Sequence, residues 1–494
     1  MVITLKVLNI FNKMDMEDYL ITTAKSGNKY LYADAAKYNS YIPNAFYETF
    51  GKEDSNDKSY YQQKLCFFKN HGLLEKENIR LTSKFTGEQV RKNLANLRQL
   101  LIEVTDGCNL KCKYCGYGEF YSNHDERRGV NQTFENVKVI IDYLYDLWKS
   151  EYNITSNNVF TIGFYGGEPL LNMRLIKEVI LYVEGLDTNG IEFVYYMTTN
   201  GMLLDRYADF IVQKQFQLLI SLDGDEYGDS YRVDHHGNES FSKVLANIKK
   251  LKYEYPDYYD KHVSFNAVLH DRNSVARTVK FVHDTLDKPI RLSELNPLGI
   301  AKEKLEEFHK MFKLRRESYQ VACEDEEIKK IIGDEDDETA AFRSMLLQYS
   351  GNHFMNYSNL FDYSIENEYH PTSTCRPFER KIFLTVNGKI FPCEKIGEDY
   401  PLGKLENGII HLDCDKVAEL YSRKYEEAMV SCKNCYSKRT CGQCMYFMPT
   451  NNGHLYCQNI MDLKYRQGLL SSCYSFAETN PQQYDVLLST IKLS

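Results

Sequence analysis

Apolar and polar residues between positions 100 and 300 form two patterns that alternate along the chain. Short, almost continuously apolar runs predict buried strands, and they lie at 100–104, 159–164, 191–197, 217–222, 263–269 and 290–295. Helices are predicted where apolar residues recur at helical spacing, at 134–149, 171–183, 204–212, 241–252 and 275–286. Six apolar strands that alternate with helices predict an α/β fold with a parallel sheet covered by helices. The functional side chains of such a sheet gather where its strands end.

The segment before this region, residues 1–95, mixes strands and helices. Strand-like runs at 19–23 and 29–32 precede a helical stretch at 60–70, and a further strand-like run follows at 79–81. The order of helix end, turn and strand resembles a winged-helix unit. We therefore expect a winged-helix-like domain before a sheet domain that covers residues 96–300.

The chain changes character again after residue 300. Residues 301–370 are charged and are expected to form a helical linker region, with an acidic loop at 333–339. Residues 371–494 are rich in cysteine and are expected to form turns and short strands.

Charge and composition exclude several classes of protein. The net charge is −9 and the pI is about 5.8, which argues against binding to the phosphate backbone of nucleic acids. No apolar run approaches the length of a bilayer span, and the start of the chain lacks the features of a secretory signal. We expect a cytoplasmic protein that binds neither nucleic acid nor a membrane.

The 14 cysteines are unevenly distributed along the chain. None precedes Cys66, three crowd between positions 108 and 115, and nine lie between positions 375 and 473. In a reducing compartment disulfides are rare, so metal ligation explains this grouping better than a disulfide framework does.

The first cysteine group is Cys108, Cys112 and Cys115, on a loop that leaves the first predicted strand. Thiolates select iron–sulfur clusters or zinc. Three of them in eight residues suit three corners of a cubane cluster, whose fourth iron is then open to a substrate. A zinc site that takes its fourth ligand from elsewhere is the alternative.

The C-x3-C-x2-C spacing at a strand end resembles the signature of the radical SAM superfamily. This resemblance implies a full or partial (β/α) barrel, here (β/α)6, with S-adenosylmethionine bound to a [4Fe-4S] cluster. It further implies that reductive cleavage yields a 5′-deoxyadenosyl radical, which abstracts hydrogen from the substrate, so that the cofactor carries the difficult step. A reducing partner such as flavodoxin or ferredoxin would supply the electron.

The segment after the second predicted strand supports the resemblance. Gly166, Gly167 and Glu168 resemble the GGEP segment of this family, which holds the amino group of the methionine moiety. Glycines allow close approach of the backbone, and a carboxylate accepts hydrogen bonds from an ammonium group. Tyr114, within the triplet, is expected to pack around the cluster or to approach the adenine.

Further polar residues follow the third and fourth predicted strands. Thr199 and Asn200 end the third strand, and Ser221 and Asp223 end the fourth. By the resemblance, Ser221 would face the methionine moiety and Asp223 the ribose. Arg232 would pair with the carboxylate of S-adenosylmethionine, because its fork suits bidentate pairing.

The C-terminal cysteines, taken alone, would fit a zinc ribbon as readily as a cluster site. Behind a radical SAM core they resemble the SPASM extension, which binds two auxiliary [4Fe-4S] clusters. The resemblance assigns the nearer cluster to Cys375, Cys393 and Cys444. It assigns the farther cluster to Cys432, Cys435, Cys441 and Cys457.

The C-terminal pattern departs from that family in two ways. Only two residues separate Cys441 from Cys444, where the family usually has three. The nearer cluster also lacks an obvious fourth ligand, for which Cys414, Cys473 or an open iron that binds substrate are the candidates.

Glu394 directly follows Cys393. Sulfatase-maturing relatives carry an acidic residue in this place, which implies a catalytic base near the substrate. The alternative is a solvated carboxylate or one paired with a lysine, such as the adjacent Lys395.

The resemblance implies a peptide substrate. We expect a leader-dependent maturase of ribosomally made peptides, in which residues 1–95 bind the leader of a precursor peptide by strand addition. It would install intrapeptide cross-links, with a thioether favoured and carbon–carbon or carbon–oxygen bonds as alternatives. The second hypothesis is an anaerobic sulfatase-maturating enzyme that forms formylglycine, and a more remote one is a zinc-stabilised binding protein without catalytic activity.

Overall fold

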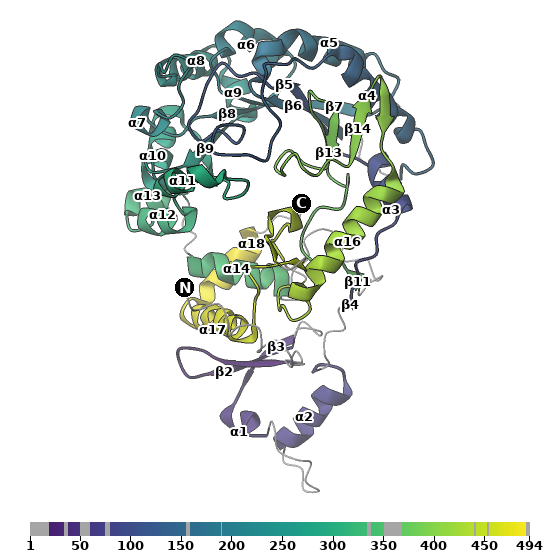
Figure 1. The fold of residues 1–494 in the computed structure, drawn as a ribbon. Helices are drawn as coiled ribbons and strands as arrows, with labels where there is room; N and C mark the ends of the chain where they lie inside the picture. Colours follow the sequence, from purple (N-terminus) through teal and green to yellow (C-terminus); the bar gives the residue numbers. More distant parts are fainter. Residues whose placement is uncertain are drawn as a thin grey trace. The chain divides into compact units, whose positions relative to one another are not determined.

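The computed structural model describes residues 19–33, 38–49, 60–74, 80–154, 159–188, 190–332, 337–349, 368–438, 441–451 and 454–490. The chain divides into two compact units, each built from separate stretches of sequence (Figure 1). Unit 1 comprises Met1–Lys84, Glu335–Thr374 and Ser422–Ser494, and unit 2 comprises Phe85–Asp334 and Cys375–Tyr421.

Unit 2 is built on six parallel strands, as the apolar runs predicted. They are β5 (Gln99–Thr105), β6 (Val159–Gly166), β7 (Glu192–Thr199), β8 (Gln217–Ser221), β9 (Val263–Leu269) and β10 (Ile290–Glu294). Neighbouring strands are consecutive in the sequence and pair in parallel. The intervening helices include α4 (Phe134–Trp148), α5 (Met173–Glu184), α6 (Leu204–Gln213), α8 (Phe241–Glu254) and α10 (Val275–Leu286). Figure 1 shows α5, α6 and α8 along the outer side of this sheet.

The two faces of the parallel sheet differ in polarity. Side chains such as Phe164, Ile220 and Phe265 are fully buried on the face that the helices cover. Their neighbours in sequence point to the opposite face and are partly exposed, for example Tyr165 and Asn266. The alternation leaves one polar face of the sheet within reach of a ligand.

The parallel sheet continues beyond β5 with residues from far along the chain. Strand β12 (Ile382–Leu384) pairs in parallel with β5. It is followed by the antiparallel strands β13 (Lys389–Phe391), β14 (Gly403–Glu406) and β15 (Ile409–His411). Residues that the sequence placed in the cysteine-rich region therefore extend the barrel sheet.

Unit 1 contains an antiparallel sheet of β1 (Leu20–Thr23), β2 (Lys29–Ala33) and β3 (Tyr38–Ile42). One of its faces packs on α1 (Asn44–Tyr47) and α2 (Tyr60–Asn70), with Leu31 and Phe46 fully buried between them. The other face packs on α17 (Leu463–Thr479), where Tyr30 stacks on Tyr474 with ring centroids 4.3 Å apart. The N-terminal sheet is thus sandwiched between local helices and a helix from the C-terminal region.

The region after residue 300 contains more helix than expected. Its helices are α11 (Leu305–Met311), α12 (Arg315–Ala322), α13 (Glu326–Ile332), α14 (Asp337–Tyr349), α16 (Cys414–Cys432), α17 and α18 (Pro481–Thr490). The acidic loop expected at 333–339 is wrong from Asp337 onward, where α14 begins. Acidic residues favour helix N-termini as well as loops, and Phe342 and Met345 of α14 are buried in the core formed with α17.

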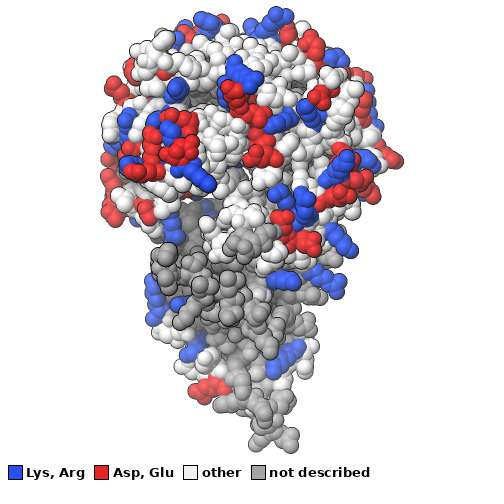
Figure 2. Space-filling model, in the orientation of Figure 1, with Lys and Arg blue, Asp and Glu red and all other residues white. Residues whose placement is uncertain are grey.

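Two surface properties bear on the expected partners. Among the described residues, no helix combines the length and apolar character that a membrane crossing requires. On the visible face of unit 2, basic and acidic side chains are interspersed (Figure 2).

The core of unit 2 can be tested through the single tryptophan of the chain. Trp148 lies in α4 with its ring centroid 4.6 Å from that of Phe160, so its fluorescence reports unfolding of this unit. Ile102 of β5 is fully buried, and its replacement by Ala is expected to destabilise the unit by about 2–5 kcal/mol in urea titrations. Ile154→Ala is the control, because Ile154 is 82% exposed. Equal unfolding midpoints for the two variants would contradict the assigned core.

Candidate active site

The three cysteines of the triplet lie on the loop after β5, with their thiols close to one another. The amide of Cys115 donates to the carbonyl of Cys112 at 3.2 Å, which folds the loop into a tight turn. Burial raises the pKa of Cys108 to about 11 and that of Cys112 to about 12, and the charge of neighbouring thiols raises both pKa values further. Thiols in such a setting are stabilised as thiolates when they bind a metal centre.

The Gly166–Gly167 segment crosses directly behind the cysteine loop. The amide of Gly167 donates to the carbonyl of Thr105 at 2.8 Å. A Cβ atom on Gly166 would lie 2.2 Å from the oxygen of Thr105, and one on Gly167 would lie 2.0 Å from the oxygen of Gly107. Gly166 also has φ of 128°, a conformation that favours glycine. Both glycines are therefore required for the close approach of β6 to the loop.

Glu168 is fully buried and joins the ends of β6 and β7. Its carboxylate accepts from Thr199 Oγ1 at 2.7 Å and from the amide of Asn200 at 2.8 Å. It also accepts from the amide of Leu170 at 3.1 Å. Burial raises the pKa of Glu168 to about 7, because its hydrogen-bond donors are all uncharged. Oε2 receives one of these bonds and retains a lone pair for an ammonium group.

Asn200 connects β7 to the cysteine loop. Its side-chain amide donates to Asn109 Oδ1 at 2.8 Å and lies 3.7 Å from the sulfur of Cys108. Ser221, at the end of β8, is partly exposed on the polar face of the sheet and pairs in register with Asn266. The polar residues predicted at the ends of β6, β7 and β8 therefore do lie at one edge of the sheet.

Asp223 and Arg232 form a buried bidentate ion pair. Arg232 donates from Nε to Asp223 Oδ2 at 2.9 Å and from Nη2 to Oδ1 at 3.0 Å. Oδ1 also accepts the amide of Val268 at 2.8 Å, and Oδ2 accepts the hydroxyl of Tyr114. Although burial opposes ionisation, the guanidinium holds the pKa of Asp223 at about 2. With four donors in place, Asp223 has no acceptor site left for a ribose hydroxyl, and we reassign it as the residue that positions Arg232.

His270 belongs to the same network and was not identified from the sequence. It is fully buried, stacks on Tyr114 at 5.4 Å between centroids, and has Nε2 3.8 Å from Asp223 Oδ2. Its Nδ1 accepts the amide of Arg272 at 3.2 Å, and its Nε2 faces Asp223. The residue directly follows β9, so the strand-end rule that located the other polar residues also applied to it.

Glu394 is paired with a lysine, but not with its neighbour in sequence. Lys381 donates to both carboxylate oxygens of Glu394, at 3.0 and 3.2 Å. The sulfur of Cys393 lies 3.6 Å from the same carboxylate. The carboxylate of Glu394 therefore lies beside Cys393, a predicted cluster ligand, and is in direct contact with the ammonium group of Lys381.

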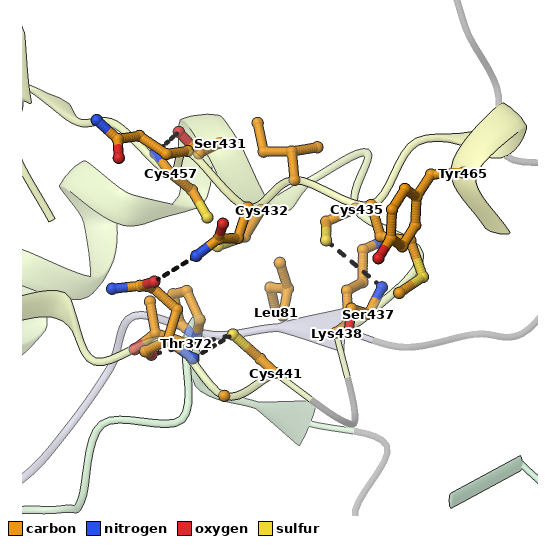
Figure 3. A pocket seen from close by; sticks show the side chains of 17 residues that line it. Leu81, Thr372, Ser431, Cys432, Cys435, Ser437, Lys438, Cys441, Cys457 and Tyr465 are labelled. Atoms are coloured by element: carbon orange, nitrogen blue, oxygen red, sulfur yellow. Dashed lines mark hydrogen bonds between the residues drawn. The ribbon is translucent and has the colours of Figure 1, made fainter. Parts of the chain in front are cut away.

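The four cysteines predicted to hold the farther cluster surround one cavity in unit 1, with a volume of about 600 Å³ (Figure 3). Cys432, Cys435, Cys441 and Cys457 all line it. Burial raises the pKa of Cys432 to about 12, and the charges of the other three thiols raise it further. The amides of Ser437 and Gln443 donate to the sulfurs of Cys435 and Cys441, each at 3.4 Å. Amide donors stabilise thiolate charge, as a cluster ligand requires.

The remaining cysteines fall into separate environments. Cys375 and Cys393 belong to unit 2 and Cys444 to unit 1, and their joint ligation of the nearer cluster stays a prediction. Cys473 is buried in the apolar core between α17 and the N-terminal sheet. Cys414 lies near Arg91 and Tyr143 at the start of α16. Within the described ranges, no three His, Cys, Asp or Glu side chains converge on a position for a single metal ion.

Comparison with known proteins identifies the class to which the barrel belongs. Residues 102–285 match the Radical SAM superfamily. The chain therefore carries a radical SAM domain, as the cysteine triplet and the strand-end motifs predicted.

Several peptide- and protein-modifying enzymes are similar to this chain. A cysteine-type anaerobic sulfatase-maturating enzyme of Clostridium novyi (strain NT) is 33% identical over 161 residues, or 32% of this chain and 41% of the relative. The radical SAM cyclopropyl synthase TigE of Paramaledivibacter caminithermalis is 23% identical over 387 residues, or 75% of this chain and 70% of TigE. The matched stretch spans only 41% and 49% of the first two curated relatives.

A solved structure shares the fold. Native anSMEcpe with bound AdoMet superposes with a TM-score of 0.53 at 19% sequence identity, covering 80% of this chain and all of the other.

The residues at the strand ends fit S-adenosylmethionine and a cluster. The triplet supplies three soft ligands, Glu168 retains an acceptor for an ammonium group, and Arg232 lies close enough to Cys112 to lower the pKa of its thiol. When bound, the cluster and S-adenosylmethionine supply a carbon-centred radical. With S-adenosylmethionine bound, Glu168 would hold the ammonium group and Arg232 the carboxylate of the methionine moiety.

Binding of S-adenosylmethionine is expected to depend on the ionisation of Glu168. Because its pKa is about 7, the carboxylate is ionised above this pH and neutral below it. The dissociation constant, measured anaerobically by equilibrium dialysis, should rise about tenfold per pH unit between roughly pH 7 and pH 5. The Glu168→Gln variant should bind more weakly and lose this slope. A slope that persists in the variant would contradict the assignment.

Loss of the Asp223 carboxylate is expected to weaken the same binding. Asp223→Asn removes the bidentate counter-charge of buried Arg232 and leaves Asp229, 3.4 Å from its Nε, as the remaining carboxylate. Affinity should fall by roughly 10- to 100-fold, because a group that positions a ligand-holding side chain is lost. Asp225→Asn is the matched control, because Asp225 caps α7 (Glu226–Asp229) and an Asn can replace that cap. Wild-type affinity in the Asp223 variant would show that Arg232 is positioned by other groups.

Proposed function

We propose that this protein is a radical SAM peptide maturase that reductively cleaves S-adenosylmethionine and installs intrapeptide cross-links in a ribosomally made precursor. The observation that carries the proposal is the thiol triplet after β5, against which the Gly166–Gly167 backbone packs without space for a Cβ atom. The triplet would hold the cluster beside the buried donors and acceptors of the strand ends, such as Asn200, whose amide lies 3.7 Å from the sulfur of Cys108. A flavodoxin or ferredoxin would supply the electron.

The N-terminal sheet supports a leader-bearing peptide as the substrate. In the strand order β1-β2-β3, the strand β3 lies at an edge of the described sheet. An exposed strand edge offers backbone donors and acceptors to an added strand. Tyr41 of β3 is 51% exposed and provides an aromatic contact beside that edge. We assign this edge to the leader of the precursor.

Two auxiliary clusters complete the proposal. The cavity of unit 1 would hold one of them through its four cysteines, and Cys375, Cys393 and Cys444 would hold the other. With three protein ligands, the second cluster keeps an open iron that can bind a substrate thiolate, and this favours a thioether over carbon–carbon or carbon–oxygen bonds. Glu394 would accept a proton from the substrate, and Lys381 donates to its carboxylate at 3.0 Å.

The test is anaerobic co-expression with each short peptide encoded near this protein as a candidate precursor, followed by mass spectrometry. Each cross-link should remove two hydrogens from the precursor. Cys112→Ala should abolish the mass loss and lower the iron content by about four atoms per chain, the content of one cubane. Cys323→Ala is the control, because Cys323 lies at the end of α12, remote in sequence from both cysteine groups. An unmodified precursor with the iron-replete wild type would overturn the proposal.

Formylglycine formation is the second candidate, favoured by the 33% identity to the sulfatase-maturating enzyme of Clostridium novyi. It predicts oxidation of a cysteine or serine in a sulfatase-derived peptide that lacks a leader. Removing the leader from the precursor should abolish cross-linking, whereas a sulfatase peptide would be processed regardless. A zinc-stabilised binding protein would instead give a colourless preparation with zinc and little iron or sulfide.

A further inference from the structure

The polar face of the parallel sheet carries a tyrosine at its centre, near the cysteine loop. Tyr165 is the penultimate residue of β6, directly before Gly166, and pairs in register with Glu103 of β5. Its ring packs edge-on against Phe383 of β12, with centroids 6.2 Å apart. Because Phe383 is itself buried, the ring of Tyr165 is held in one place.

Three ionisable groups lie near enough to this tyrosine to influence the pKa of its phenol. Burial raises the pKa of Tyr165, and the charges of Glu394, Cys115 and Tyr196 raise it further. The phenol therefore lies within electrostatic reach of both the radical-generating triplet and the predicted base. It stays protonated at neutral pH and can donate a hydrogen bond.

The hydroxyl of Tyr165 differs from those of the neighbouring tyrosines because no other protein group among the described residues forms a hydrogen bond with it. Within the described part of the chain it has no hydrogen-bond partner, and it is not sealed from solvent. On the same face, Tyr196 already shares a hydrogen bond with Thr198 Oγ1 at 3.0 Å. On the opposite face, the hydroxyl of Tyr195 donates to Glu184 at 3.2 Å. Tyr165 is the one of these three that has a donor free for a ligand.

We propose that Tyr165 donates a hydrogen bond to the peptide substrate and fixes the reacting residue between the cysteine triplet and Glu394. This inference rests on the proposed function and adds a substrate-contacting residue to it. The acceptor is a carbonyl oxygen of the peptide backbone, which every peptide offers regardless of its side chains. Because packing holds the ring, the hydroxyl donor is already in position before the substrate binds. Binding therefore loses little free energy to ordering of this side chain.

The experiment compares Tyr165→Phe with wild type on the same precursor peptide. Loss of one neutral hydrogen bond to the substrate should raise the peptide KM by roughly fivefold to tenfold. Misplacement of the reacting residue should also lower the amount of cross-linked product per 5′-deoxyadenosine formed. Cleavage of S-adenosylmethionine without peptide should stay at the wild-type rate, because the cofactor site is untouched.

Tyr195→Phe is the matched control, since it removes the same atom from an adjacent strand on the helix-covered face. It should leave the peptide KM and the product ratio unchanged. If Tyr165→Phe matches wild type in both quantities, the inference is overturned while the proposed function stands. If the wild type forms 5′-deoxyadenosine but modifies no peptide, the proposed function fails, and the inference fails with it.

Discussion

The carboxylate of Asp223 joins more of the active site than any other group described above. It accepts hydrogen bonds from the cysteine loop through Tyr114, from β9 through Val268, and twice from Arg232. It follows β8 itself, so four segments converge on two oxygen atoms. Removing one partner of a buried ion pair lowers stability by more than an exposed ion pair contributes to it, because the remaining charge has no water to solvate it. The carboxylate of Asp223 thus adds to the contacts by which Gly167 and Asn200 hold the cysteine loop at the strand ends.

A second buried carboxylate shows how the partners of a group decide its charge. Glu168 and Asp223 are both fully buried, at the ends of β6 and β8 on either side of β7. Burial raises the pKa of Glu168 to about 7, whereas Arg232 holds that of Asp223 at about 2. Asp223 is consequently a permanent anion and serves as a structural anchor. Glu168 can change charge in the physiological range, which suits a group that must accept a cationic ligand.

The sequence was sufficient to predict the barrel sheet, because β5 to β9 each carry buried apolar residues, whereas β10 has none and was predicted from its apolar residues alone. It was also sufficient to bring Glu168, Thr199 and Asn200 together, since consecutive parallel strands end at one edge. The sequence was not sufficient to predict the role that each side chain plays at that edge of the sheet. The saturation of Asp223 by four donors, the inclusion of His270 and the pairing of Glu394 with Lys381 all depend on side-chain contacts between distant segments. The helix α17 was missed because its apolar residues gain meaning only when they cover the N-terminal sheet, whereas α14 lies in the region that was expected to be helical.

The contact between that sheet and α17 has a consequence for how the protein is made. During synthesis, β1 to β3 leave the ribosome more than 400 residues before α17 does. Until α17 arrives, Tyr30 and Leu20 lack the core into which they pack. The surface we assign to the leader therefore acquires its full support only after the barrel and the cysteine-rich region have been translated. The proposed recognition of a precursor would in this way be reserved for chains that already possess the machinery proposed to modify it.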